Sequence, residues 1–221
     1  MLKLENVTKY YHTSSSVTCA LSKVNLEFNI GEFVIITGES GSGKTTLLNV
    51  ISGLDTYEDG ELYYNGQPTS HYSDEELENY RKTEIAFIFQ NYNLIESFTV
   101  LENVMIPLII DGYKMADAKT KALVLLDEVG LIKLKNKKVI KLSGGEKQRV
   151  SIARALAKET NIIIADEPTG NLDSKNEDEV FNYLKDISKD KCVIVVSHNE
   201  KIKNYADKVV YLEKGVLKDE N

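Results

Sequence analysis

The stretch that decides the fold is Gly38-Glu39-Ser40-Gly41-Ser42-Gly43-Lys44-Thr45. It has the spacing G-x-x-x-x-G-K-T, in which glycines let the backbone wrap around phosphate oxygens and aim N–H groups at them. The lysine supplies a positive charge for the outer phosphates, and the threonine hydroxyl suits Mg²⁺. The apolar run 32–37 precedes this loop, and a helix is expected from Thr45 to Ser52. Strand, loop and helix in that order predict a P-loop core.

Three nearly continuous apolar runs are expected to build a central sheet, at residues 32–37, 161–166 and 192–197. Strands that are buried on both faces have this composition, so the runs predict a mostly parallel sheet covered by helices. Each run is followed by a polar or glycine-rich loop. Ligands gather at the carboxyl ends of such strands, so these loops are candidates for the functional site.

A small antiparallel unit is expected from the shorter strand candidates. Residues 24–30 alternate between apolar and polar, which is typical of a half-buried strand. The apolar side consists of Val24, Leu26, Phe28 and Ile30. Residues 2–7 and 61–64 are shorter candidates, and Asn65-Gly66 after the second is a strong turn signal. Near the C-terminus, Lys214-Gly215 is expected to turn a hairpin.

Helices are expected between these strands. The helix predicted over residues 73–82 begins with Ser73 and Glu76 in capping-box spacing, and an amphipathic helix is predicted over residues 115–129. Ser174 and Glu177 predict a second capping box.

Together the elements predict one α/β domain over residues 1–221. Its P-loop sheet core would carry an antiparallel β subdomain and an inserted α-helical subdomain. We expect the core with its β subdomain at about residues 1–90 and 159–221, and the helical subdomain at about 91–158.

An acidic pair, Asp166-Glu167, ends the isoleucine-rich run. An aspartate at this position can hold Mg²⁺ through its water shell. The adjacent glutamate is placed to polarise a water for attack on a γ-phosphate. An isolated Asp-Glu-Pro could be a plain acidic turn, but a P-loop in the same chain favours the catalytic interpretation.

A second glycine-rich segment lies far downstream, Leu142-Ser143-Gly144-Gly145-Glu146. It precedes a helix expected from Glu146 to Lys158, whose N-terminal end, with a serine hydroxyl and backbone N–H groups, suits an anion. The segment has no Lys-Thr for metal and no adjacent catalytic carboxylate, so it is half of a phosphate site. Alone, it would be read as an ordinary serine-capped helix.

Composition limits the function classes. The chain has 221 residues and a formal net charge of -7, which argues against broad nucleic-acid binding. Five lysines at residues 133–141 are expected to form a solvated loop. Cys19 and Cys192 have no metal or redox spacing and fit a reducing cytoplasm. No apolar stretch approaches the roughly 18–20 residues that span a bilayer, so a membrane role must come through a partner.

With these motifs in order, the sequence resembles the ATP-binding subunit of an ABC transporter over essentially the whole chain. The matching segments are Tyr11 (adenine stacking), Gly38–Thr45 (Walker A), Gln90 (Q-loop), Leu142–Gln148 (signature), Ile162–Asp166 (Walker B), Glu167 (catalytic glutamate), Asn171–Asp173 (D-loop) and His198 (switch histidine). The neighbouring Tyr10 leaves the position of the stacking aromatic open.

The resemblance implies ATP and Mg²⁺ as ligands. It implies catalytic roles for Lys44, Glu167 and His198, and Mg²⁺ contacts from Thr45, Gln90 and Asp166. The implied nucleotide contacts are Tyr11, Gly38, Glu39, Ser40, Gly41, Ser42, Gly43, Lys44, Thr45, Thr46, Gln90, Ser143, Gly144, Gly145, Glu146 and Asp166.

The resemblance also implies partners. Two copies would bind head to tail, so that ATP on Lys44 of one copy is closed by Ser143 and Gly145 of the other. The dimer would drive a separate integral-membrane permease from the cytoplasmic face of the plasma membrane, with no role for nucleic acid.

Residues 90–95 and 165–173 look most like the branch of lipoprotein-release, macrolide and antimicrobial-peptide export and cell-division ATPases. This predicts export or extraction of a hydrophobic or peptide substrate by mechanotransmission. The alternative is a regulatory ATPase whose membrane partner activates cell-wall enzymes without transport. A third class, soluble nucleic-acid-acting relatives, is disfavoured because the chain has no long coiled-coil insert or second such domain. Two departures from the branch are Glu146 in place of glutamine and Val139-Ile140-Lys141 in place of the usual proline.

Overall fold

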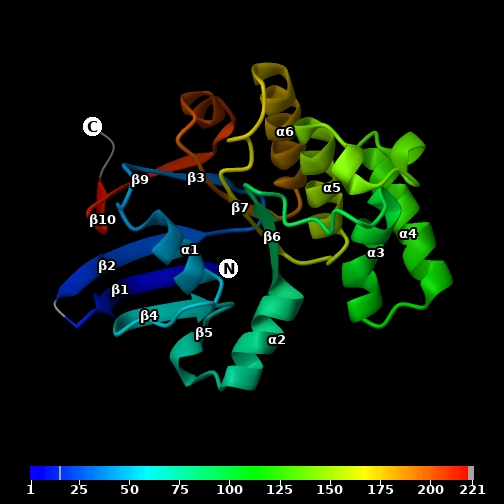
Figure 1. Cartoon of the computed structure of the whole chain (residues 1–221). Helices are drawn as coiled ribbons and strands as arrows, with labels where there is room; N and C mark the ends of the chain where they lie inside the picture. The colour runs from blue at the N-terminus through cyan, green and yellow to red at the C-terminus, as the bar shows by residue number, and fades with distance from the viewer. Residues whose placement is uncertain (15, 219–221) are drawn as a thin grey trace.

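The computed structural model describes residues 1–14 and 16–218 (Figure 1). The strands are β1 Leu2–His12, β2 Val17–Phe28, β3 Phe33–Thr37, β4 Asp59–Tyr64, β5 Gln67–Pro68, β6 Ile85–Phe89, β7 Ile162–Asp166, β8 Cys192–Val196, β9 Lys208–Glu213 and β10 Val216–Lys218. The α-helices are α1 Lys44–Ile51, α2 Asp74–Glu84, α3 Val100–Ile110, α4 Met115–Glu128, α5 Gly144–Leu156 and α6 Ser174–Ile187. Short 3-10 turns lie at Thr69–His71, Ile132–Leu134, Val139–Lys141 and Glu200–Tyr205.

The central sheet has six strands in the order β10-β9-β3-β8-β7-β6. All neighbours in it are parallel except the β9–β10 pair, which forms the expected terminal hairpin. The mostly parallel P-loop sheet is therefore confirmed. Because β3 and β7 both end at the same edge, the P-loop and the acidic pair that follows β7 meet there.

A second sheet is antiparallel and has the order β2-β1-β4-β5. It lies beside α1 and α2 at one end of the molecule (Figure 1). One expectation about its second strand is wrong. That strand ends at Phe28, and Ile30 is 52% exposed because the chain turns at Gly31, whose φ is +88°.

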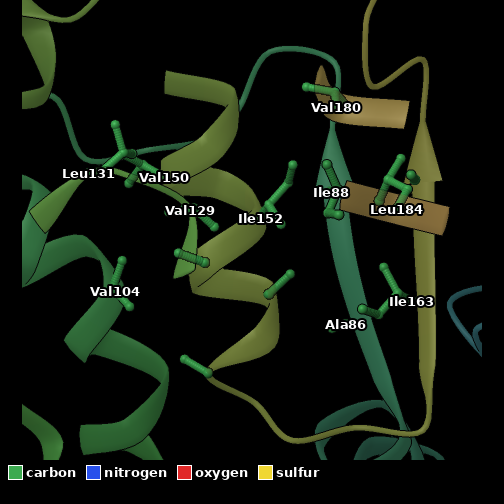
Figure 2. Packing of buried hydrophobic residues seen from close by; sticks show 14 of the residues in the cluster. Ala86, Ile88, Val104, Val129, Leu131, Val150, Ile152, Ile163, Val180 and Leu184 are labelled. Carbon is green, nitrogen blue, oxygen red and sulfur yellow. The ribbon is translucent and has the colours of Figure 1, made fainter. Parts of the chain in front are cut away.

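The central sheet is buried on both faces, and its strands divide their side chains between two hydrophobic cores. Along β7, Ile163 and Ala165 belong to the core under α3–α6, whereas Ile162 and Ile164 face the core shared with α1 and the antiparallel sheet. Figure 2 shows α5 between α3 and β6, with Ile152 directed toward Ile88. Burial on both faces explains why the strand sequences are continuously apolar rather than alternating.

Helices α3, α4 and α5 lie between β6 and β7 in the chain and pack on one another at one side of the molecule (Figure 1). Two helix starts differ from expectation. α6 is capped by Asp173, whose carboxylate accepts from the Asn176 N–H at 3.0 Å, and not by Ser174. α5 begins at Gly144, so both glycines of the second glycine-rich segment lie in its first turn.

Within the described residues, no helix is both long enough and apolar enough to cross a membrane. The apolar helix α3 has 11 residues and contains Pro107.

Candidate functional site

The loop between β3 and α1 passes very close to two other strands. A Cβ placed on Gly38 would lie 2.1 Å from the carbonyl oxygen of Leu212 in β9, and one on Gly43 would lie 2.4 Å from that of Ala20 in β2. Gly43 also has a φ of +105° and caps α1. Glycine is therefore required at both positions by steric fit, and at Gly43 also by backbone conformation.

Gly43→Ala is expected to lower the free energy of unfolding by at least about 1–3 kcal/mol, the typical cost of a strained backbone position, with the contact to Ala20 adding to it. Gly41→Ala is the matched control, because Gly41 has a φ of +77° but no atom within 4 Å of an added Cβ. Urea unfolding of both variants measures the difference. Equal losses of unfolding free energy in the two variants would mean that the close approach of β2 to Gly43 does not add to the cost of the substitution.

Two polar residues of the loop, Lys44 and Ser42, are buried. The Lys44 side chain is 7% exposed, and its Nζ donates to the carbonyls of Gly38 and Glu39, each at 2.8 Å. Burial lowers the pKa of Lys44, while the charges of Glu167 and Asp166 act in the opposite direction. Ser42 Oγ is buried without a hydrogen-bond partner. A buried hydroxyl without a partner is costly, and a phosphate oxygen would satisfy it.

A cavity of about 860 Å³ lies over this loop. It gathers the predicted residues Tyr11, Ser40, Gly41, Gly43, Lys44, Thr45, Thr46, Gln90, Asp166, Glu167 and His198. The predicted contacts Gly38, Glu39, Ser42, Ser143, Gly144, Gly145 and Glu146 are not among its lining residues. The carbonyls of Gly38 and Glu39 instead accept from Lys44 Nζ, and Gly38 lies against Leu212.

The acidic pair at the end of β7 lies inside the cavity. Burial raises the pKa of Asp166, and the Lys44 charge partly offsets this. Burial also raises the pKa of Glu167, whereas His198 acts to lower it through its charge and its backbone N–H. Glu167 is held by two donors, the His198 N–H at 3.0 Å from Oε1 and Ser197 Oγ at 3.4 Å from Oε2. A half-buried carboxylate with a raised pKa is a candidate general base.

His198 follows β8 and stands beside this glutamate. Its Nε2 lies 3.7 Å from Glu167 Oε1, and its side chain is 54% exposed. Glu167 itself has a φ of +45°, which is uncommon for a residue other than glycine. Its backbone N–H donates to Val196 at 2.9 Å, so β8 fixes both the strained glutamate and the histidine.

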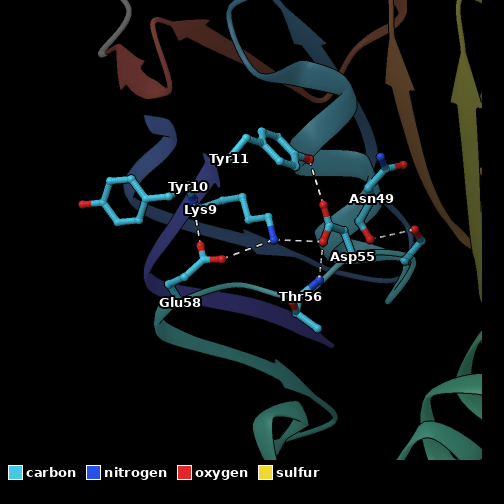
Figure 3. A network of polar contacts seen from close by, with 8 residues as sticks. Lys9, Tyr10, Tyr11, Asn49, Asp55, Thr56 and Glu58 are labelled. Carbon is cyan, nitrogen blue, oxygen red and sulfur yellow. Dashed lines mark hydrogen bonds and ion pairs between the residues drawn. The ribbon is translucent and has the colours of Figure 1, made fainter. Parts of the chain in front are cut away.

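Tyr11, and not Tyr10, lines the cavity. The two side chains point in opposite directions from β1, and the Tyr11 ring lies beside α1 (Figure 3). Tyr11 is 39% exposed, so part of its surface is open to solvent. Of the two tyrosines, Tyr11 is therefore the one that lines the cavity, and its stacking role stays a prediction.

The second glycine-rich segment lies outside the cavity and forms the N-terminus of α5. Ser143 Oγ accepts from the Glu146 N–H at 3.3 Å, and Glu146 Oε2 accepts from the Ser143 N–H at 2.9 Å. A Cβ on Gly145 would meet Asn176 Oδ1 at 2.3 Å, so this glycine lets α5 approach the start of α6. The structure thus provides a second helix N-terminus for an anion, separate from the first.

Five lining residues were not anticipated from sequence: Thr18, Cys19, Ala20, Val196 and Lys214. Three of them belong to β2, which extends seven residues further toward the N-terminus than its alternating pattern indicated. Lys214 was predicted in a hairpin turn, but only the pairing of β9 with β3 brings that turn to the P-loop. No local signal marks these positions, because tertiary pairing alone brings them together.

Arg154 connects α5 to the loop after Gln90. Its guanidinium donates to the carbonyls of Tyr92, at 2.7 Å, and Asn93. Tyr92 and Asn93 have φ values of +61° and +48°, so the loop is strained where the arginine holds it. Burial lowers the pKa of Arg154. The arginine therefore links the helix of the second glycine-rich segment with the Gln90 loop.

Arg154→Lys is expected to lower the free energy of unfolding by about 1–3 kcal/mol, because an ammonium cannot reproduce the two-pronged contact with both carbonyls. Hydrogen exchange in residues 91–95 should also become faster. Arg149→Lys on the same helix is the control, since Arg149 pairs with the exposed Glu179 at 2.7 Å. Such surface pairs contribute under about 1 kcal/mol. Urea unfolding with equal losses for the two variants would contradict the assigned role of Arg154.

Comparisons with known proteins agree with this geometry. Residues 21–170 match the family model described as "ABC transporter". The chain is 43% identical to the lipoprotein-releasing system ATP-binding protein LolD of Saccharophagus degradans, over 98% of this chain and 96% of that protein. It is 40% identical to the macrolide export ATP-binding/permease protein MacB of Chlorobaculum tepidum, over 100% of this chain but 34% of that protein.

Among solved structures, the chain is similar to the dimeric, post-hydrolysis form of the ATP-binding cassette MJ0796 bound to ADP and Pi. The TM-score is 0.90 at 41% identity, covering 100% of this chain and 98% of that one. The family match covers more than half of the chain, and the identities extend over nearly all of it. The chain therefore belongs to the ABC transporter family.

Proposed function

We propose that this protein binds ATP with Mg²⁺ and hydrolyses it as the ATPase subunit of a transporter complex. The single observation that carries the proposal is the 860 Å³ cavity, in which a P-loop lysine, two half-buried carboxylates and an exposed tyrosine ring stand together. The similarity to a cassette solved with ADP and Pi supports it.

The P-loop residues would hold the phosphates. Lys44 and the N-terminus of α1 supply positive charge, and the Ser42 hydroxyl supplies a further donor. Thr45, Gln90 and Asp166 would hold Mg²⁺, since hydroxyl, amide and carboxylate oxygens are ligands that this ion accepts. Bound there, the ion would neutralise charge on the phosphates.

Glu167 would act as the general base. Water attacks the γ-phosphorus, Glu167 takes up a proton of that water, and the bond to the bridging oxygen breaks to give ADP and phosphate. Burial raises the pKa of Glu167, which makes its carboxylate a better proton acceptor than an exposed one. His198, at 3.7 Å from Glu167, would position the γ-phosphate.

The second half of the site would come from a second copy. Ser143, Gly144, Gly145 and Glu146 form a helix N-terminus suited to an anion, yet they do not line this chain's own cavity. A head-to-tail dimer would bring them onto ATP bound by the other copy. The dimeric assembly of the similar cassette MJ0796 supports this arrangement.

A membrane permease would dock beside the Gln90 loop. A groove of about 360 Å³ lies there, with Phe87, Phe89 and Pro107 among its lining residues. Ile110 in the same groove is 66% exposed, which is unusual for a large apolar side chain. Arg154 also lines the groove and donates to the carbonyls of Tyr92 and Asn93. A permease segment docked in the groove would therefore contact the arginine that holds the Gln90 loop.

The names of the similar proteins, lipoprotein release and macrolide export, support a finer proposal. The complex would extract or export a hydrophobic or peptide substrate, such as a macrolide or an antimicrobial peptide, by mechanotransmission. The protein would act at the cytoplasmic face of the plasma membrane through its permease. A regulatory ATPase whose partner activates cell-wall enzymes is the alternative.

The test is affinity capture of tagged Glu167→Gln protein from detergent-solubilised membranes of the native host, with MgATP present. We expect a permease to be recovered. The type of external domain that it carries would reduce the number of possible substrate classes. Lys44→Ala protein is the control and should recover less permease in the same conditions. A permease recovered together with a cell-wall hydrolase would favour the regulatory alternative. Recovery without any membrane protein would contradict the permease proposal.

A further inference from the structure

A polar network lies behind Tyr11, one of the residues that line the cavity (Figure 3). The Tyr11 hydroxyl donates to Asp55 Oδ2 at 2.8 Å. Lys9 Nζ donates to the other oxygen, Asp55 Oδ1, at 2.9 Å, and lies 5.3 Å from the centre of the Tyr11 ring. Two independent contacts, one to the hydroxyl and one over the ring, therefore restrict how Tyr11 can turn.

Lys9 is unusual because a lysine is rarely buried. Its side chain is 7% exposed and faces two carboxylates, Asp55 at 2.9 Å and Glu58 at 3.4 Å. Burial acts to lower the pKa of Lys9, but the hydrogen bond and charge of Asp55, with Glu58 adding to them, raise it. The ammonium thus stays charged and anchors Asp55 from within the protein.

Asp55 is in turn fixed to the P-loop helix. Its backbone N–H donates to the carbonyl of Asn49 in α1 at 3.1 Å, and its Oδ1 accepts from the Thr56 N–H at 2.8 Å. Burial acts to raise the pKa of Asp55, but hydrogen bonds from Lys9, Tyr11 and the Thr56 N–H together lower it. The carboxylate is therefore ionised and accepts bonds from β1 and from its own loop.

The network connects the helix that follows the P-loop with the Tyr11 ring. α1 begins at the phosphate-binding loop, and Asp55 follows its C-terminal end. Tyr11 comes from β1, on the other sheet. Asp55 joins these parts, so the distance from the phosphate-binding loop to the Tyr11 ring depends on it.

We propose that Lys9 and Asp55 are positioning residues that hold the Tyr11 ring at a fixed place for stacking on the nucleobase. The inference rests on the proposed function, in which Tyr11 stacks on the base of ATP. Stacking on an aromatic ring contributes to binding affinity only when the ring is aligned with the base. A ring that is already held in place loses less conformational freedom when the ligand binds. Lys9 and Asp55 would thus determine affinity for the base and leave affinity for the phosphates unchanged.

Titration calorimetry with Mg²⁺ and two probes tests this in the full chain: ADP, which has a base, and inorganic tripolyphosphate, which has none. Tyr11→Phe keeps the ring and removes the hydroxyl, with its bond to Asp55 and its contact with Thr46. Asp55→Asn keeps the shape of the side chain. Because an amide has only one acceptor oxygen, it cannot accept from both Tyr11 and Lys9 on separate atoms, as the carboxylate does. Each is expected to weaken ADP binding by about tenfold, the effect of a hydrogen bond to a charged group. The double variant should be no weaker than either single one, because both break the same contact.

Two reference variants complete the design. Glu58→Gln alters a carboxylate that contacts Lys9 and the Tyr10 N–H but not Tyr11, so both affinities should stay within about twofold. Tyr11→Ala removes the ring and should weaken ADP binding by about tenfold or more, while tripolyphosphate binding is retained.

The outcomes separate the inference from the proposed function. If Tyr11→Ala binds ADP as the unchanged protein does, stacking on Tyr11 is wrong. If Tyr11→Ala weakens ADP binding but Tyr11→Phe and Asp55→Asn do not, stacking stands and the positioning role is overturned. Equal losses of ADP and tripolyphosphate in Asp55→Asn would also overturn it, because they would indicate a general structural role.

Discussion

The Glu167→Gln protein is expected to hydrolyse ATP about 1000-fold more slowly, within the range for loss of a general base, while still binding ATP. The amide keeps the shape of the side chain, and its oxygen can still accept from the His198 N–H, which lies 3.0 Å from Glu167 Oε1. It cannot take a proton from water. Binding should therefore survive and turnover should not, so ATP should accumulate on the protein.

Phosphate release and nucleotide retention after gel filtration measure the two effects separately. The matched control is Glu200→Gln, which should hydrolyse ATP normally. Glu200 lies two residues after His198, and its exposed carboxylate pairs with Lys203. Turnover in Glu167→Gln within tenfold of the unchanged protein would contradict the assignment of the base.

Lys44→Ala is expected to weaken ATP binding by about 100-fold or more, since several charge-assisted hydrogen bonds to phosphate are lost. The fold should survive. Burial lowers the pKa of Lys44, so the charged ammonium is less stable in this position than in water, although Glu167 and Asp166 act in the opposite direction. The variant loses the bonds from Nζ to the carbonyls of Gly38 and Glu39, and it loses the positive charge that partly offsets the raised pKa of Asp166.

Equilibrium binding of MgATP measures the loss, and circular dichroism checks the fold. Lys119→Ala on the exposed face of α4 removes the same charge outside the cavity and should bind ATP as before. Retention of affinity within a few-fold in Lys44→Ala would show that ATP does not bind at the P-loop.

Features with local chemistry could be predicted from the sequence. The P-loop requires glycines and Lys-Thr at fixed spacing, and the strands before it and before Asp166 are apolar because both faces are buried. The α/β class, the parallel sheet and the antiparallel sheet are confirmed. The boundaries at residues 91 and 158 between core and helical subdomain stay a prediction, as do the roles of the individual site residues.

Other features depend on contacts between distant segments. Ile30 continues an alternating pattern, yet the strand ends at Phe28 because Gly31 turns the chain. Ser174 has the spacing of a cap, but Asp173 one residue earlier takes the role. Lys9 and Asp55 are 46 residues apart, and no sequence pattern predicted that they meet beneath Tyr11. Pairing of β1 with its neighbours and the turn after α1 decide that contact.

The central claim is that ATP is shared head to tail between two copies, and complementation tests it most directly. Two proteins are prepared with Glu167→Gln, one also carrying Lys44→Ala and the other Ser143→Arg. A homodimer of either protein would have a defect in both of its shared ATP sites. Each protein alone should therefore stay monomeric with MgATP in sedimentation velocity. An equimolar mixture contains dimers with one intact site, built from the unchanged Lys44 and the unchanged Ser143. We predict a dimer in the mixture only. A mixture that stays monomeric, while Glu167→Gln protein alone dimerises, would contradict the account.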